Sequence, residues 1–303
     1  MLARTQEALR EPGSRQVAQI GTALDAALHG LLDYAGLFPP AHLSVRAAIE
    51  NYQQYASGPH AEVLACFVLS FSHLDALRSI PHSPAQFPLS LTGPFDAPWY
   101  EIEQLQRDGL RIQMIEVKVS SAKQIRSIQE MLPAGTIRYF EIPLDSSTST
   151  LLPAIANAEG RVKLRLGGVM DAAFPAPQLL AETLHAVAHH RLKFKATAGL
   201  HHPLRSIQPL TYEPNSALTR MHGFINLLSA AALLHLGGSV HQAEAVLLEE
   251  DPAEWTIAPD CIQWRDHRWP KALLREVRQC FLMSIGSCSC TEPMDELEAL
   301  GWR

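Results

Sequence analysis

Lysines alternate with apolar residues in one segment of the chain, and this spacing is the first indication of chemistry. In residues 191–198, Lys193, Lys195 and Thr197 share one face of an extended strand. A buried ammonium is costly unless it is paired or deprotonated, and catalytic pockets are the commonest place where proteins tolerate that cost. Lys195, nearer the strand end, is therefore expected to have a depressed pKa and to act as a Schiff-base nucleophile or a general base.

Three further segments combine an apolar face with an ionisable one. Arginine and lysine on such a face suit a substrate carboxylate or phosphate, and glutamates beside them can move protons. The ionisable residues are Glu116 and Lys118 in residues 113–119, Glu141 in residues 138–143, and Lys163 and Arg165 in residues 161–167.

Apolar strands alternate with helical segments along the chain, and this order requires parallel strands joined by helical crossovers. We predict one (β/α)8 TIM-type barrel domain over residues 1–303, with a helical and hairpin insertion at about residues 221–270 between strands seven and eight. A doubly wound sheet is the alternative fold. The expected strands are residues 32–38, 62–70, 88–93, 112–119, 137–144, 162–167, 192–198 and 280–286.

In such a barrel, residues at the carboxyl ends of the strands converge on one pocket. His201 and His202 follow the seventh strand and should point opposite ways on an extended backbone. Ser287 opens a loop of small residues that could present backbone amides to an anion. The candidates for the pocket are Asp33, Ser70, Glu116, Lys118, Glu141, Asp145, Lys163, Arg165, Lys195, Thr197, His201, His202 and Ser287.

Composition narrows the class of protein. Of the 303 residues, 47% are hydrophobic and 18% charged, so the chain can bury one large core. A net charge of −6 without a basic run argues against nucleic acid as a partner. Without a membrane-length apolar stretch or a signal peptide, the chain is expected to be cytoplasmic.

Cysteines and one apolar helix add weaker signals. Cys288 and Cys290 have C-x-C spacing, but no second cysteine pair completes a zinc site, so a loop of small residues is the simpler interpretation. Residues 221–235 are apolar nearly all round, which predicts a buried helix or a subunit interface and leaves a homo-oligomer open. His222 and Asn226 on this helix are placed to reach the pocket rim.

Two short segments resemble known families. Lys195-Ala-Thr-Ala-Gly199 is similar to the Lys-x-Ser/Thr-x-Gly strand of deoxyribose-phosphate aldolases, barrels with a Schiff-base lysine, which implies that Lys195 forms the imine and Thr197 lines the pocket. That family carries a second lysine on the following strand, whereas Lys163 here lies on the preceding one. Residues 162–168 also resemble the Lys-x-Lys/Arg strand of the enolase superfamily, but the next strand offers lysines where that family has carboxylate metal ligands.

Three functions follow from these patterns. The first is a lyase or aldolase acting on a small carbonyl compound that bears a carboxylate or phosphate, without a metal or other cofactor. In it Lys195 is the nucleophile, Glu141 or Glu116 the proton shuttle, and Lys163 with Arg165 the anion clamp. Further substrate contacts are expected from Lys118, Thr197, His201, His202, Asp33 and Ser287.

The second function is a metal-dependent lyase or isomerase in the same pocket. A divalent ion would take its ligands among Asp33, Glu116, Glu141, His201 and His202. The third is a non-catalytic barrel that binds an anionic metabolite, or a protein partner through residues 221–270.

Overall fold

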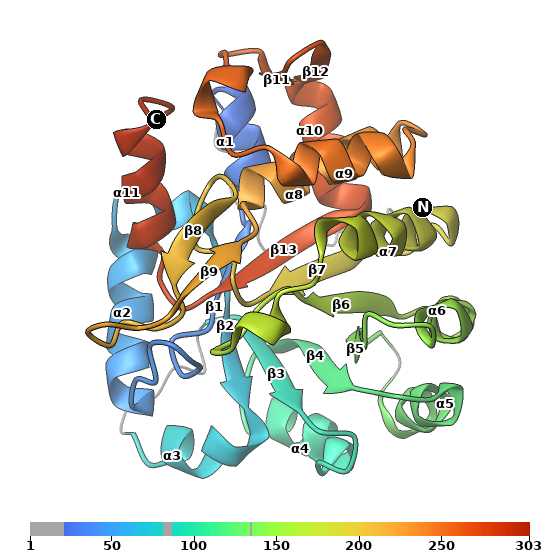
Figure 1. Cartoon of the computed structure of the whole chain (residues 1–303). Coiled ribbons are helices and arrows are strands. Elements are labelled where there is room, and N and C mark those ends of the chain that lie inside the picture. Colours follow the sequence, from blue (N-terminus) through green and yellow to red (C-terminus); the bar gives the residue numbers. More distant parts are fainter. Residues whose placement is uncertain (1–20, 81–86, 134) are drawn as a thin grey trace, which may run out of the picture.

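Eight parallel strands close into a barrel in the computed structural model, which describes residues 21–80, 87–133 and 135–303. The barrel strands are β1 (Leu32–Tyr34), β2 (Leu64–Ser70), β3 (Leu89–Gly93), β4 (Ile112–Lys118), β5 (Ile137–Ile142), β6 (Arg161–Arg165), β7 (Phe194–Thr197) and β13 (Leu282–Ser287). Their order around the barrel is β1-β13-β7-β6-β5-β4-β3-β2 (Figure 1). The predicted α/β barrel is therefore confirmed, and the doubly wound alternative is wrong because its sheet would be open.

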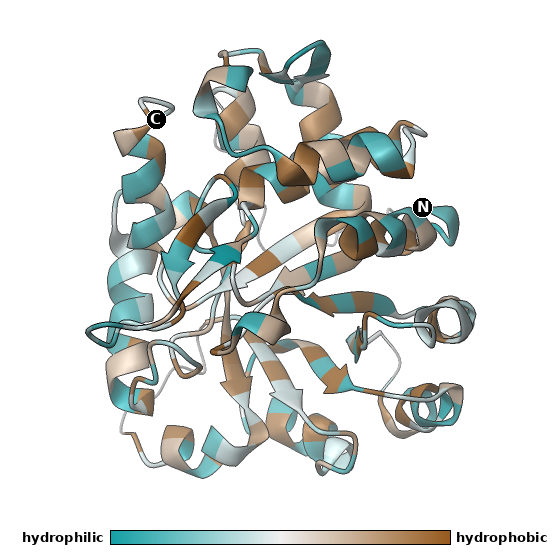
Figure 2. Cartoon of the chain, in the orientation of Figure 1, coloured by the Kyte–Doolittle hydropathy of each residue, from teal (hydrophilic) through white to brown (hydrophobic). Residues whose placement is uncertain are grey.

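Helices cover the outside of the barrel and bury the apolar face of each strand. Phe140, Val162, Leu164 and Phe194 point outward and are fully buried beneath them. In Figure 2 the strands carry bands of hydrophobic colour, as an outward apolar layer requires. The helices that follow barrel strands are α2 (Val45–Ser57), α3 (Leu74–Arg78), α4 (Ile102–Arg107), α5 (Ala122–Met131), α6 (Thr148–Asn157), α7 (Pro177–His189) and α11 (Thr291–Ala299).

The chain between β7 and β13 forms more elements than any other connection. The helix α8 is buried along almost its whole length, so the buried-helix interpretation of residues 221–235 is correct. The β8–β9 hairpin lies in front of the barrel strands in Figure 1. These elements are β8 (Ser206–Pro209), β9 (Leu218–Met221), α8 (Phe224–His235), α9 (Val240–Leu248), β10 (Trp255–Ile257), β11 (Cys261–Trp264), β12 (His267–Pro270) and α10 (Lys271–Cys280).

Several boundaries differ from those predicted. The first strand ends at Tyr34, and the segment that includes Met221 is a hairpin strand rather than the start of a helix. The seventh strand begins at Phe194, so Lys193 lies at the opposite end of the barrel and lines a surface cavity there. Cys280 is exposed at the end of α10.

In the part of the chain that the structure describes, no helix combines the length and apolar character needed to cross a membrane.

A sharp turn after β7 directs the following residues across the barrel mouth. Ala198 and Gly199 have φ angles of 65° and 67°, in the left-handed region. A Cβ atom on Gly199 would lie 2.5 Å from Cε1 of Phe174 and 3.1 Å from the carbonyl oxygen of Leu166. Glycine is therefore required here both by conformation and by space.

We predict that Gly199→Ala lowers the free energy of unfolding by about 2–4 kcal/mol, because the left-handed penalty and the clash add. The control is Gly237→Ala, whose φ is 83° but whose added Cβ would meet nothing within 4 Å. It should cost about 1 kcal/mol, the conformational penalty alone. Urea unfolding of both variants measures the difference, and equal losses would contradict the crowding at Gly199.

Candidate functional site

The ammonium of Lys195 lies at the centre of the barrel. This side chain is only 1% exposed. Its Nζ donates to Oδ2 of Asp33 on β1 and, at 2.5 Å, to Oε1 of Glu116 on β4. The ring centroid of Tyr139 is 5.4 Å away, so the cation also faces an aromatic surface. The predicted inward position of Lys195 is correct, and its partners come from strands on both sides of the barrel.

Further ion pairs continue from Glu116 toward the mouth. Nζ of Lys163 lies 2.8 Å from Oε2 of Glu116 and 2.7 Å from Oε2 of Glu141. Nε of Arg165 donates to Oε1 of Glu141 at 3.0 Å. The register explains these contacts, since Glu141, Lys163 and Lys195 lie opposite one another on β5, β6 and β7. Three carboxylates and three cations thus alternate in an ion-pair chain: Asp33, Lys195, Glu116, Lys163, Glu141 and Arg165.

Neutral side chains supply the remaining donors to the two deepest carboxylates. Asp33 accepts from Oγ of Ser284 at 2.5 Å and from Sγ of Cys66 at 2.9 Å. Glu116 accepts from Oγ of Ser90 at 2.5 Å. Buried carboxylates with several donors are stable as anions. Sequence reasoning missed these three donors, because a small residue on an apolar strand gives no signal of its own.

Pairing outweighs burial in setting the charges. Burial opposes ionisation of Glu116, but Lys163 and Lys195 hold its pKa well below the usual range. Glu141 is likewise buried, and Lys163 and Arg165 lower its pKa to about 2. Burial disfavours the ammonium of Lys195, yet Asp33 and Glu116 raise its pKa well above the ordinary value. The expected depressed pKa of Lys195 is therefore wrong, because two carboxylates from distant strands contact it.

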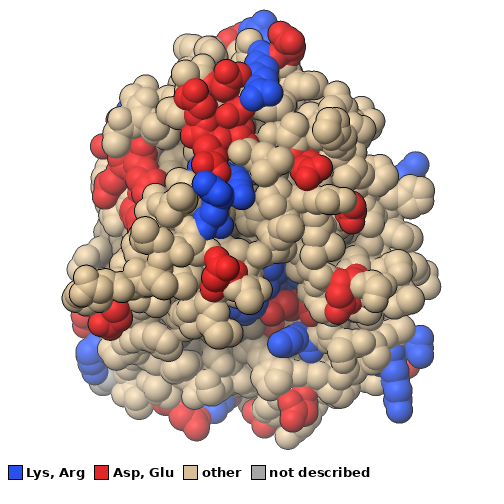
Figure 3. Space-filling model, viewed as in Figure 1, with Lys and Arg blue, Asp and Glu red and all other residues tan. Residues whose placement is uncertain are grey.

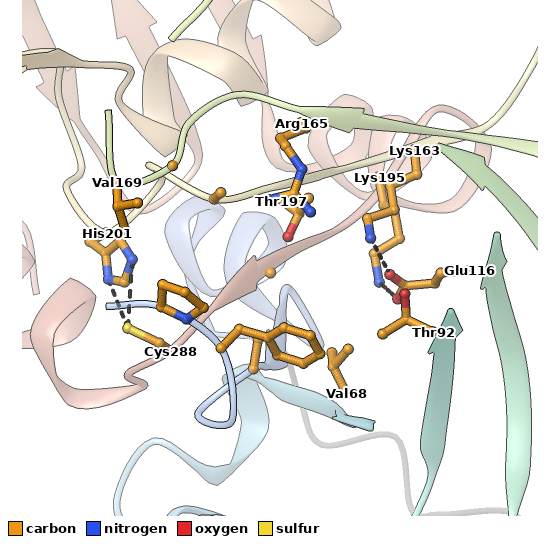
Figure 4. A pocket seen from close by; sticks show the side chains of 16 residues that line it. Val68, Thr92, Glu116, Lys163, Arg165, Val169, Lys195, Thr197, His201 and Cys288 are labelled. Atoms are coloured by element: carbon orange, nitrogen blue, oxygen red, sulfur yellow. Dashed lines mark hydrogen bonds and ion pairs between the residues drawn. The ribbon is translucent and has the colours of Figure 1, made fainter. Parts of the chain in front are cut away.

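A cavity of about 230 Å³ opens above the ion-pair chain, at the carboxyl ends of the barrel strands. Figure 4 shows Lys163 and Lys195 pointing at Glu116 on one side of it. Acidic and basic side chains meet in a hollow on the face shown in Figure 3. Arg165 lines this cavity and a neighbouring one of about 350 Å³, which Lys118 also lines. Both of these side chains are exposed, unlike Lys163.

A second polar cluster occupies the other side of the cavity. Nδ1 of His201 lies 3.0 Å from Oε2 of Glu292, and Sγ of Cys288 lies 3.7 Å from Nε2 of His201 (Figure 4). The hydroxyl of Tyr212 donates to Glu292 at 3.0 Å and lies 3.4 Å from the sulfur. Burial opposes the imidazolium, but Cys288 and Glu292 raise the pKa of His201 to about 10. We call these four residues the thiol cluster.

Sequence reasoning found only part of this cluster. His201 was a candidate, whereas Cys288 was judged by its C-x-C spacing, and Glu292 and Tyr212 were not considered. The positions of two of these residues could have indicated the cluster, because Cys288 directly follows the last barrel strand and Glu292 stands in the first turn of the next helix.

Other predicted residues serve local structure. Nδ1 of His202 lies 2.6 Å from Glu296, so both histidines contact α11 and the expectation that they point opposite ways is wrong. Ser287 donates to the carbonyl oxygen of Ser289 at 2.6 Å, and the first turn of α11 is occupied by the acidic residue Glu292 rather than left open to an anion. Asp145 accepts from Ser147, and Ser70 from the amide of Ser72.

His222 and Asn226 also have structural partners. Nε2 of His222 lies 2.8 Å from the carbonyl oxygen of Pro175, and burial lowers the pKa of this histidine to about 4. The amide of Asn226 donates to the carbonyl oxygens of Val246 and Glu249. Neither side chain lines the cavities at the mouth.

The residues considered as metal ligands are not gathered around a common point. Asp33, Glu116 and Glu141 face lysines and an arginine, while His201 and His202 face carboxylates of α11. Within residues 21–80, 87–133 and 135–303, no group of three or more His, Cys, Asp or Glu side chains could hold a metal ion.

Comparison with known proteins adds no relative: no protein-family model matches the chain, and no curated protein matches it.

We predict that Glu116→Gln lowers the free energy of unfolding by about 3–5 kcal/mol, because it leaves Lys195 and Lys163 buried with one carboxylate fewer. The matched control is Glu103→Gln on α4, which breaks an exposed 3.2 Å pair with Arg107 and should cost less than about 0.5 kcal/mol. Chemical denaturation at neutral pH measures both.

The pH dependence of stability provides a further check of the same variant. Because the carboxyl pKa values are lowered by folding, the wild-type pairs contribute fully above about pH 4.3, the ordinary glutamate pKa. The contribution is lost as pH falls toward the pKa of about 2 of Glu141. A Glu116→Gln variant as sensitive to acid as the wild type would contradict this assignment.

Proposed function

We propose that this chain is a carbon–carbon lyase of the aldolase type, which acts through an imine on Lys195. The observation that carries the proposal is the position of this residue: Lys195 lines the mouth cavity, and its Nζ has a carboxylate within hydrogen-bond distance on two sides. Imine formation needs an amine and groups that remove and return its protons. Asp33 and Glu116 are placed to do so.

The protons of the imine step balance within these residues. The Lys195 ammonium gives up a proton to Glu116, and the free amine attacks the substrate carbonyl carbon to form a C–N bond. The carbonyl oxygen leaves as water, carrying two of the three ammonium hydrogens by way of Glu116 and Asp33. The cationic imine then accepts the electron pair of the bond between its α- and β-carbons as that bond breaks, and the β-carbon becomes a carbonyl as its hydroxyl gives a proton to Glu116. The enamine takes a proton back from Glu116 on its α-carbon, and water hydrolyses the imine to release the second product and restore Lys195.

The raised pKa of Lys195 requires that substrate binding change the ion pairs. Arg165 is about half exposed, and among the described residues its ion-pair partner is Glu141. If Arg165 turns to a substrate anion, Glu141 keeps Lys163 as its partner and draws it away from Glu116. Glu116 then has only Lys195 as a close cation instead of both lysines. Its pKa therefore rises, and it can take the proton of Lys195. The ion-pair chain thereby couples anion binding to nucleophile activation.

The substrate class follows from the lining of the cavities. Arg165 offers a planar fork suited to a carboxylate or phosphate, and Lys118 adds a second cation in the neighbouring cavity. Lys163 contacts two carboxylates and is therefore assigned to proton positioning rather than to the anion clamp. A mouth cavity of about 230 Å³ favours a small substrate.

The resemblance to deoxyribose-phosphate aldolases supports the same amine. The Lys195-Ala-Thr-Ala-Gly199 segment forms barrel strand β7 and the turn after it. Thr197 lines the cavity, as that resemblance implies. The second lysine stands on a different strand from that of the family: Lys163 is on the strand before Lys195 and lies opposite it in register.

A non-catalytic barrel that binds an anionic metabolite is the second candidate function. It is favoured by the complete pairing of Lys195 and Lys163, which a purely structural network would also have. The two functions differ in whether Lys195 forms a covalent bond with a carbonyl compound.

We predict that sodium borohydride, added with a panel of small oxo-acids and sugar phosphates, produces an adduct on Lys195 that intact mass and peptide mapping detect. Lys195→Met should abolish the adduct. Lys193→Met should keep it, since that lysine lies at the opposite end of the barrel. Trapping should accelerate as pH rises, because the pKa of Lys195 is raised and only the neutral amine attacks. Ligand-induced stabilisation without an adduct would instead support the binding function.

We predict that Arg165→Gln raises KM for the trapped substrate by about 10- to 100-fold, because the variant loses a charge-assisted hydrogen bond to the substrate anion. Lys118→Gln should raise it less, because Lys118 lines only the neighbouring cavity. Steady-state kinetics on both variants measure the effect. An unchanged KM in Arg165→Gln would remove this residue from substrate recognition.

A further inference from the structure

We propose that Cys288 is a second nucleophile of the barrel mouth, activated by His201 and Glu292 for acyl transfer from esters or thioesters. The proposal is independent of the imine on Lys195. It rests on three side chains that approach one another from the turn after β7, the end of β13 and the first turn of α11. They have the order of a nucleophile, a base and a group that orients the base.

The contact with Glu292 determines which ring nitrogen faces the thiol. A carboxylate accepts hydrogen bonds only, so the 3.0 Å contact assigns a proton to Nδ1 of His201. Nε2 is then free to take the proton of Cys288, 3.7 Å away. The sulfur is also 3.8 Å from Nδ1, so a small rotation of the ring or of the thiol aligns the transfer.

His201, the base beside the thiol, binds a proton strongly. The pKa of His201 is raised to about 10 by Cys288 and Glu292 against the effect of burial, so the imidazole readily holds the thiol proton as a cation. A thiolate beside an imidazolium is the reactive form of cysteine. The other groups facing the sulfur are neutral acids: Tyr212 at 3.4 Å, Cys290, whose pKa burial raises to about 12, and Tyr34 on β1.

The thiol cluster lies between two cavities. Cys288 lines the cavity of about 230 Å³, together with Arg165. A second cavity of about 120 Å³ is lined by Tyr212 and Glu292, and His201 borders both. An acyl group with an anionic end can therefore occupy the larger cavity, with its carbonyl carbon at Cys288 and its leaving group toward His201.

The reaction balances without any further reactant than water. The thiolate attacks the carbonyl carbon, a C–S bond forms, and the bond to the oxygen or sulfur of the leaving group breaks. His201 gives its proton to that leaving group. Neutral His201 next takes a proton from water as the hydroxide attacks the thioester, and the acid is released with the thiol restored.

The first test is alkylation by iodoacetamide between pH 5 and 9, followed by peptide mass mapping. Cys280 is exposed and serves as the internal control for an ordinary thiol. At pH 6, Cys288 should react about tenfold or more faster than Cys280, because His201 can take the proton of Cys288, whereas an ordinary exposed thiol is mostly protonated at that pH. Cys288 is buried but lines the mouth cavity, whereas Cys66 and Cys290 are buried and line neither of the two cavities, so they should remain unmodified.

The variant His201→Gln should move the alkylation profile of Cys288 to the higher pH range of Cys280, while the rate of Cys280 stays the same. An unchanged profile would overturn the activation by His201. Failure of Cys288 to react while Cys280 does would also overturn the proposal, since a nucleophile must admit a two-carbon reagent.

The second test uses p-nitrophenyl acetate as the acyl probe. We expect a burst of one nitrophenolate per chain with a 42 Da acetyl mass increase on Cys288, both lost in Cys288→Ser and retained in the control Lys193→Met, at the opposite end of the barrel. Peptide mapping separates this proposal from the imine chemistry, because an acetyl group on Lys195 instead of Cys288 would refute it. A burst or an acetyl group that persists in Cys288→Ser would refute it.

Discussion

The ammonium of Lys195 between Asp33 and Glu116 is the interaction on which the barrel interior depends. Each of these groups is almost fully buried, so each would be strongly destabilising alone. Their partners come from β1, β4 and β7, which meet only when the barrel closes. Glu141 on β5 and Lys163 on β6 continue this alternation of paired buried charges. The charges therefore favour one closed arrangement of strands, because an open or shifted sheet would leave buried charges without partners.

Much of the fold and half of the candidate site follow from local patterns. The alternation of charged and apolar residues placed Glu116, Glu141, Lys163 and Lys195 on inward faces, since this depends only on the period of a strand. Ion pairs between distant strands do not follow from this local pattern. Lys195 and Asp33 are 162 residues apart in the chain, and their contact depends on closure of the sheet. The direction in which folding shifts the pKa of Lys195 could not be predicted from the sequence. Burial and ion pairing shift this pKa in opposite directions, and the local sequence pattern indicates burial alone.

Residues beyond the strand ends were the hardest to predict. The expected opposite orientation of His201 and His202 assumed an extended backbone. The left-handed turn at Ala198 and Gly199 and the position of α11 instead direct both histidines to acidic partners. The thiol of Cys288 was evaluated as a metal ligand because cysteine spacing is a local property. Its closeness to His201 arises from the pairing of β7 with β13, which no spacing reveals.

That pairing also explains why one barrel mouth can contain an amine and a thiol in different environments. Lys195 lies opposite Ser284, deep in the barrel, where exclusion of water strengthens its ion pairs. Cys288 follows the last residue of β13 and is buried as well, but it lines the cavity at the barrel mouth. A charged amine needs fixed carboxylates to exchange protons with, whereas a thiol needs a single imidazole and access. The depth of each residue along two neighbouring strands matches the environment that the proposed chemistry requires, and Arg165 borders the same cavity.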